Sequence, residues 1–295
     1  MTEIFGVPTQ ALFGQLLIGL INGSFYALLS LGLAVIFGLL NIINFTHGAQ
    51  YMMGAFVAYL MLNKLGIGYW WALLIAPIVV GATGVLIERL MLSRLYQLDH
   101  LYGLLLTFGL ALIIQGLFRN QYGSSGQPYA MPTQLLGSQN LGFMFLPNYR
   151  GWVIGASIVI CLSTWFVIER TRLGANLRAA TENPTLVRAF GINVPRMITL
   201  TYGFGVGLAA LAGVMAAPIY NVSPQMGSDL IIVVFAVVVI GGMGSIMGAI
   251  VTGFALGLVE GLTKVFYPEA SNIVVFVIMA IVLVIRPAGL FGKEK

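Results

Sequence analysis

Long apolar stretches recur along the whole chain, and they constrain the fold more than any other feature. A helix that crosses a membrane needs about 20 mostly apolar residues. Stretches of this kind lie at 11–38, 45–63, 69–88, 101–118, 152–168, 197–217, 229–246, 249–266 and 271–286. We therefore expect an all-α integral membrane protein. It would be a polytopic helical bundle of about eight to ten membrane-spanning helices, nine as the central value, in a single transmembrane domain over residues 1–295.

Two regions decide the number of spans. Residues 229–266 are too long for one crossing, and they contain Gly241-Gly242-Met243-Gly244-Ser245, a glycine-rich sequence typical of a break. Residues 11–40 are also long for one span and include Asn22-Gly23-Ser24. That first region is either one tilted helix or a broken one.

The composition excludes several classes of protein. Charged residues make up only 8% of the chain and hydrophobic residues 59%, whereas about a quarter of a soluble domain is charged. One cysteine and two histidines offer no disulfide and no familiar metal-binding motif. The excess positive charge is spread thinly between apolar stretches, so it predicts membrane orientation rather than nucleic-acid binding. We also expect that the chain is not an enzyme and that it binds no cofactor itself.

The positions of lysine and arginine predict the orientation, because cytoplasmic loops are enriched in both. With nine spans, ten of the 14 basic residues lie on one side: Arg89, Arg94, Arg170, Arg172, Arg178, Arg188, Arg196, Arg286, Lys293 and Lys295. The other four are Lys64, Arg119, Arg150 and Lys264. The first side is then cytoplasmic and includes the C-terminus.

Two loops are longer than turns. Residues 119–151 would lie outside the cell, either as a landing surface for an external partner or as a plain solvated loop. Residues 169–196 would lie inside and are predicted to hold two short amphipathic helices. The first runs from Arg172 to Thr181, with Leu173, Leu177 and Ala180 on one face and Arg178 on the other.

The second short helix has a start signal and a stop signal. Asn183 is a good N-cap, and Pro184 suits the first helical position. Leu186, Val187 and Phe190 supply an apolar face, and Gly191 stands where a C-terminal glycine stop belongs. This segment is either an interfacial helix on membrane lipid or a docking element for a cytoplasmic protein.

Other patterns predict packing rather than chemistry. The chain has no GxxxxGK[ST] loop, so it lacks that device for binding nucleotides. Several glycines are spaced by four, among them Gly253, Gly257 and Gly261, which favours close packing of helices within the chain. Glu260 and Lys264 are also four apart, so they form either a structural ion pair or part of a transport route.

Four blocks of sequence resemble one family, in its own order. The first is Asn41-Ile42-Ile43-Asn44-Phe45-Thr46-His47-Gly48, followed by Tyr51-Met52-Met53-Gly54. The second is Arg178-Ala179-Ala180-Thr181-Glu182-Asn183, with Ala189-Phe190-Gly191-Ile192-Asn193 after it. The third runs from Gly241 to Ala249, with Met247 where the family pattern has proline, and the last from Arg286 to Gly292. Together they resemble the LivH-type permeases, membrane subunits of ATP-driven importers of branched-chain amino acids.

The resemblance implies one half of a transmembrane dimer in the bacterial inner membrane. A LivM-like second permease would be the other half. Two cytoplasmic ATP-binding-cassette ATPase subunits would use the ATP, and a periplasmic substrate-binding protein would deliver leucine, isoleucine or valine. Candidate ATPase-coupling residues are Arg178, Ala179, Glu182, Asn183, Pro184, Phe190 and Gly191. Candidate residues of a translocation path or gate are Asn44, His47, Gly241, Gly242 and Gly244.

Alternatives remain at this point. The same type of permease would also suit a urea or short-chain amide importer, because the binding protein sets most of the selectivity. A stand-alone secondary transporter or channel is a third reading, and it predicts activity without any ATPase. Asn44 and His47 have two readings as well, either as caps of the second helix or as part of the substrate path.

Overall fold

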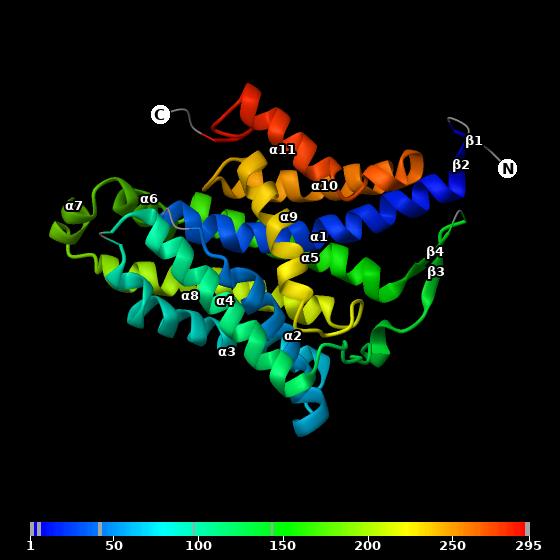
Figure 1. Cartoon of the computed structure of the whole chain (residues 1–295), viewed down its shortest axis with the longest axis horizontal. Coiled ribbons are helices and arrows are strands. Elements are labelled where there is room, and N and C mark those ends of the chain that lie inside the picture. The colour runs from blue at the N-terminus through cyan, green and yellow to red at the C-terminus, as the bar shows by residue number, and fades with distance from the viewer. Residues whose placement is uncertain (1–2, 5–6, 41–42, 97, 143, 293–295) are drawn as a thin grey trace. The chain divides into compact units, whose positions relative to one another are not determined.

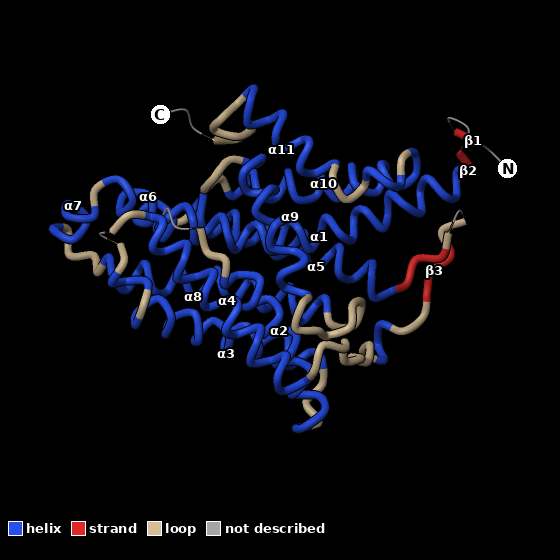
Figure 2. The backbone as a smooth tube through the Cα atoms, in the orientation of Figure 1, coloured by secondary structure: helices blue, strands red, loops and turns tan. Residues whose placement is uncertain are grey.

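The computed structural model describes residues 3–4, 7–40, 43–96, 98–142 and 144–292, and within them the chain is almost entirely helical (Figures 1 and 2). The α-helices are α1 (Thr9–Leu40), α2 (Thr46–Leu65), α3 (Tyr69–Leu90), α4 (His100–Tyr122), α5 (Asn148–Arg170), α6 (Arg172–Glu182), α7 (Pro184–Ala189), α8 (Val194–Ala216), α9 (Met226–Gly241), α10 (Ile246–Phe266) and α11 (Val274–Ile285). Three short 3₁₀ turns are η1 (Leu92–Arg94), η2 (Thr133–Leu135) and η3 (Pro268–Ala270).

Each of the nine expected apolar stretches overlaps one of these helices. Six of the helices described are long and apolar enough to cross a membrane: α1, α3 with the η1 turn, α4, α5, α8 and α10. Two shorter apolar helices are α9 and α11. The chain is therefore a helical membrane protein, and nine crossings stays a prediction.

The two ambiguous regions are resolved. The first is a single continuous helix, α1, of 32 residues. The break in 229–266 is confirmed, but α9 ends at Gly241 rather than at 246. Gly242 and Gly244 have φ angles of 100° and 83°, outside the right-handed helical region, so the helix stops there and α10 starts after Ser245.

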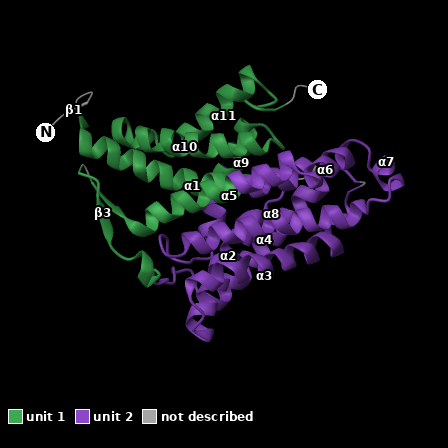
Figure 3. Cartoon of the chain, turned by 180° about the vertical axis from the view of Figure 1, so that it is seen from behind, with its two compact units in different colours: residues 1–30, 131–161, 233–295 green, residues 31–130, 162–232 purple. Residues whose placement is uncertain are grey.

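The chain divides into two compact units (Figure 3). Unit 1 holds residues 1–30, 131–161 and 233–295, and unit 2 holds residues 31–130 and 162–232. In unit 1, α1 and α10 run side by side through glycines. A Cβ atom placed on Gly19 would lie 2.4 Å from the backbone oxygen of Gly257, and one on Gly253 would lie 2.6 Å from the Cα of Ala27. This confirms that the glycines spaced by four pack helices within the chain.

A buried carboxyl group also joins α1 to α10. Glu260 is 8% exposed. It accepts a hydrogen bond from Tyr26 Oη at 2.6 Å and pairs with Lys264 Nζ at 2.5 Å. Asn22 Nδ2 lies 3.5 Å from the same carboxyl group. The predicted ion pair between Glu260 and Lys264 is confirmed, and its other partners tie it to helix packing.

In unit 2, α8 packs closely against α2 and α3. A Cβ atom on Gly54 would lie 2.2 Å from the backbone oxygen of Ala210, and one on Gly213 would lie 2.0 Å from that of Tyr51. Gly81 of α3 faces Gly203 of α8 in the same way, at 3.0 Å. Small residues therefore set the distance between these three helices, which carry much of the site described below.

The predicted external loop, 119–151, is shorter in the structure. Helix α4 continues to Tyr122, where Gly123 with φ 77° ends it, and α5 begins at Asn148. The polar residues 119–122 complete the last turn of α4, since polar side chains at a span end reach water. Between the helices, β3 (Ser138–Asn140) and β4 (Phe145–Pro147) form an antiparallel hairpin. A second small pair, β1 (Glu3–Ile4) and β2 (Val7–Pro8), precedes α1.

Candidate functional site

The turn before α2 is buried and polar. Asn44, Thr46, His47 and Gln50 are each at most 1% exposed. Asn44 Oδ1 accepts hydrogen bonds from the backbone N–H of Thr46, at 3.1 Å, and from the Thr46 hydroxyl. Asn44 Nδ2 lies 3.5 Å from Gln50 Oε1. Asn44 thus holds the first turn of α2, while Asn41 lies outside the described residues.

His47 faces away from solvent toward α1. A Cβ atom on Gly32 would lie 2.9 Å from His47 Cε1, so the imidazole fills the space that this glycine leaves. The hydroxyl of Tyr202, on α8, is buried beside Asn44, Thr46 and Gln50. The sequence did not predict Thr46, Gln50 and Tyr202 as site residues. Polar residues at 46, 47 and 50, on one face of an apolar helix, were the available signal for two of them.

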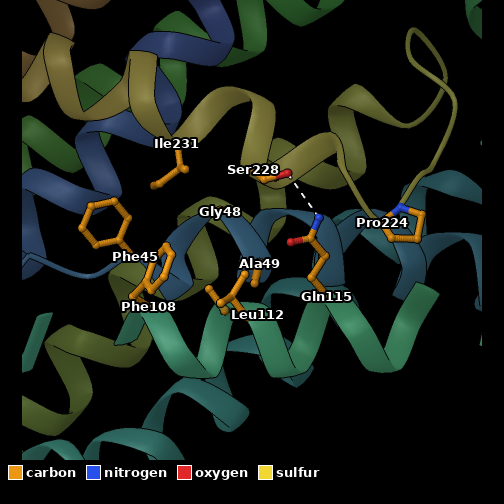
Figure 4. A pocket seen from close by; sticks show the side chains of 11 residues that line it. Phe45, Gly48, Ala49, Phe108, Leu112, Gln115, Pro224, Ser228 and Ile231 are labelled. Carbon is orange, nitrogen blue, oxygen red and sulfur yellow. Dashed lines mark hydrogen bonds between the residues drawn. The ribbon is translucent and has the colours of Figure 1, made fainter. Parts of the chain in front are cut away.

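A small, mostly apolar pocket adjoins this turn (Figure 4). Its empty volume is about 410 Å³, and it lies between the start of α2, the middle of α4 and the start of α9. The rings of Phe45 and Phe108 meet edge to face with their centroids 5.9 Å apart. Gln115 Nε2 donates to Ser228 Oγ at 3.3 Å, which gives the pocket a polar edge. Such a space suits an aliphatic side chain with a polar group beside it.

The other gate candidates lie in unit 1, where Gly241, Gly242 and Gly244 connect α9 to α10. The chain after α11 docks on this connection. Leu290 N–H donates to Ile240 O at 2.8 Å, and Phe291 N–H donates to Gly241 O at 3.1 Å. A Cβ atom on Gly242 would lie 2.4 Å from the nitrogen of Gly292. Two sequence blocks that resemble the family, far apart in the chain, are therefore in contact.

The two short helices predicted for 169–196 are confirmed as α6 and α7. Asn183 Oδ1 accepts from the N–H of Leu186 at 2.9 Å, and Pro184 occupies the first turn of α7. Gly191 has a φ of 81°, the left-handed conformation that stops the helix. The loop itself is shorter than predicted at both ends, because α5 continues to Arg170 and the side chain of Asn193 caps α8.

The apolar faces of these helices are only partly free, which corrects the sequence-based picture. Leu177, Ala180 and Val187 are at most 7% exposed, and Ala180 and Val187 pack together with Val194 at the start of α8. The exposed large apolar side chains are Leu173 at 51%, Leu186 at 54% and Phe190 at 76%. The segment thus contacts the protein by one face and exposes Leu173 on α6, Leu186 on α7 and Phe190 directly after α7.

Arg178 contacts the end of α5. Its guanidinium lies 3.3 Å from Glu169 and donates to the backbone oxygen of Ile168 at 2.9 Å. Both groups belong to the end of α5, so Arg178 fastens α6 to that helix.

Both arginine-rich loops lie at the same end of unit 2, where α3 ends and α8 begins (Figure 3). Four arginines, from 89–100 and 169–196, line one groove: Arg89, Arg94, Arg188 and Arg196. At the other end, Gln127 bridges to Val222 through their backbones and accepts a side-chain hydrogen bond from Tyr59.

Span-length helices, a buried polar turn beside an apolar pocket, and a rigid segment at the arginine-rich end define a polytopic membrane transport protein. The comparisons agree with this class. Residues 15–283 match the family model described as "Branched-chain amino acid transport system / permease component". The chain belongs to this family.

Named relatives match the chain over nearly its full length. It is 30% identical to the high-affinity branched-chain amino acid transport system permease protein LivH of Escherichia coli K12, over 100% of this chain and 99% of that protein. It is also 30% identical to BraD of Pseudomonas aeruginosa, over 95% and 96% of the two chains. The identity to LivM of Escherichia coli K12 is 27%, over 92% of this chain and 68% of LivM. No solved structure matches it.

Proposed function

We propose that this chain is the permease subunit of an ATP-binding-cassette importer of branched-chain amino acids in the bacterial inner membrane. The observation that carries the proposal is the match to LivH permeases along the whole chain, from before α1 to beyond α11. The named relatives are all branched-chain amino acid permeases, which favours this substrate class over urea or short-chain amides. A LivM-like second permease, two ATPases and a periplasmic binding protein would complete the importer.

The segment of α6 and α7 is proposed to couple the permease to the ATPases. It carries the candidate residues Arg178, Ala179, Glu182, Asn183, Pro184, Phe190 and Gly191. Its geometry supports the role, because one face is anchored on α5 and α8 while Leu186 and Phe190 are exposed. A rigid helix with free apolar side chains suits a groove on a soluble partner. This end would face the cytoplasm, as would the C-terminus.

The translocation path is proposed to run past the pocket beside the α2 turn. Asn44 and His47 act as positioning residues that hold the turn, and Phe45 closes the pocket against Phe108. The connection at Gly241, Gly242 and Gly244 is a second candidate gate. Its positive φ angles allow a tight turn between α9 and α10, and its contact with the C-terminal segment would make that turn respond to movement there.

The substrate class is tested with the complete importer in right-side-out membrane vesicles that contain ATP. We expect uptake of labelled leucine, isoleucine or valine that depends on the matching binding protein. Urea and acetamide should not accumulate, nor should they compete at a hundredfold excess. Accumulation of either amide with no accumulation of leucine would overturn the proposed substrate.

A further inference from the structure

A broad groove at the arginine-rich end of unit 2 carries unusually many positive charges. Its empty volume is about 1480 Å³. Four guanidinium groups line it, from Arg89 on α3, Arg94 on η1, Arg188 on α7 and Arg196 on α8. Among the described residues, the ion pairs are Arg178–Glu169 and Lys264–Glu260, and neither includes these four. Because arginine stays charged in proteins, a ligand with negative charge would relieve their mutual repulsion.

One acidic side chain, Glu88, also lines the groove, but its carboxyl oxygens are already engaged. Glu88 is 2% exposed. Tyr96 Oη donates to Oε1 at 2.6 Å, and Thr199 Oγ1 donates to Oε2 at 2.7 Å. Burial, followed by the hydrogen bond to Glu88, raises the pKa of Tyr96, so the phenol remains a donor at neutral pH. Glu88 therefore braces α3 against α8, and among the described residues the four arginines have no acidic partner.

The surface next to the groove is apolar along two helices of membrane-spanning length. On α8, Arg196, Leu200 and Phe204 follow one another at intervals of four, which places them on one face. Leu200 is 70% exposed and Phe204 46%. On α3, Leu86 and Leu90 are 57% and 59% exposed. The two helices that supply Arg89 and Arg196 therefore also carry exposed apolar side chains, a combination that suits an amphiphile.

We propose that this groove binds the phosphate-bearing headgroup of an anionic phospholipid, with its acyl chains lying along α3 and α8. Basic pockets between membrane helices bind such headgroups by charge and hydrogen bonding. A soluble acidic protein would satisfy the arginines, but it has no access to Leu200 and Phe204 within a span. A lipid bound at this site would contact α7, because Arg188 belongs to that helix.

The test compares two double variants of the full-length chain that lose the same charge. Arg188→Gln/Arg196→Gln removes two groove arginines. Arg119→Gln/Arg172→Gln removes two exposed arginines that do not line the groove. Each protein is purified from membranes, its lipids are extracted and the phosphatidylglycerol per chain is quantified. We expect at least threefold less phosphatidylglycerol on the groove variant and wild-type content on the control.

A second measurement separates lipid from a free anion. Delipidated protein is titrated with phosphatidylglycerol, with phosphatidylcholine and with inorganic phosphate, and its thermal unfolding is followed. Phosphatidylglycerol should raise the midpoint of thermal unfolding by several degrees in the wild type but not in the groove variant. Phosphatidylcholine and inorganic phosphate should raise it in neither protein. Equal phosphatidylglycerol on both double variants would overturn the proposal. Full stabilisation of the wild type by inorganic phosphate alone would also overturn it. So would a groove variant that keeps its phosphatidylglycerol but loses a bound soluble protein.

Discussion

At the scale of single residues, Asn44 has the most constrained position in the candidate site. It is 1% exposed, and its carboxamide holds both the backbone and the hydroxyl of Thr46 while approaching Gln50. The next residue, Phe45, forms part of the pocket wall and donates its N–H to Thr107 at 3.2 Å. Removing the Asn44 carboxamide would therefore disturb the helix start and the pocket together.

Asn44→Ala is expected to lower the free energy of unfolding by about 1–3 kcal/mol, because it leaves buried polar groups of Thr46 unsatisfied. Uptake by correctly assembled complex should fall at least tenfold, since Phe45 loses its support. Thermal unfolding of the purified complex and uptake per assembled complex measure the two effects separately. His47→Ala should act in the same direction, because it empties the space against Gly32.

The matched control is Asn63→Ala, at the far end of the same helix. Asn63 is exposed and donates only to the backbone oxygen of Tyr59, so neither quantity should change. If Asn44→Ala lost stability but kept full uptake per assembled complex, Asn44 would be a helix cap alone. The proposed path would then need other residues.

Local signals at single residues were predictable, and distant partners were not. Asn183, Pro184 and Gly191 each carry their signal in their own type and spacing, and the structure confirms all three. Glu88 is held by Thr199, 111 positions away, and no local pattern points to that contact. The contact between Arg178 and Glu169 is likewise not visible in a local pattern, because it depends on how α6 folds back onto α5.

At the scale of elements, the proposed coupling to the ATPases depends on α7. Periodicity gives the helix and its apolar face, but it cannot tell which apolar residues face the protein. Val187 packs inward, while Leu186 and Phe190 are exposed. Burial of each of these two side chains in a partner would contribute about 1.5–3 kcal/mol. The proposed docking of an ATPase on this segment therefore predicts a measurable loss of association when either side chain is removed.

Leu186→Ser and Phe190→Ser are each expected to weaken ATPase association about tenfold to a hundredfold, which follows from that burial energy. Gly191→Val should act similarly by displacing the helix end, because a side chain with a Cβ in the left-handed region costs about 1–2 kcal/mol. Membrane insertion should be normal in all three. The measurement is co-purification of the ATPase subunits, together with substrate-stimulated ATP hydrolysis.

The control for these variants is Leu136→Ser, which removes an equally exposed leucine from the segment between α4 and α5. It should leave both association and hydrolysis unchanged. Glu182→Lys is a further variant of the same segment and should also reduce co-purification, by reversing a charge beside Asn183. Wild-type association and hydrolysis in every α7 variant would remove the coupling role and favour a helix that only rests on lipid.

At the scale of the whole molecule, the sequence predicts the helices well and their grouping poorly. Apolar stretches mark where each helix lies, because lipid demands about 20 apolar residues and a satisfied backbone. They do not show that α1, α5 and α9 each contribute residues to two compact units. Nor do they show that the α9–α10 turn receives the C-terminal segment, since hydrogen bonds between residues 240–241 and 290–291 join distant parts of the chain.

The central claim is that this chain conducts substrate only as part of an ATP-driven assembly. It is tested by reconstituting the purified chain in liposomes, alone and with the second permease, the ATPases and the binding protein. We expect concentrative uptake of labelled leucine by the complete assembly when ATP is present. We expect no concentrative uptake without ATP and none by the chain alone. Concentrative uptake by the single chain would contradict it and identify a stand-alone transporter.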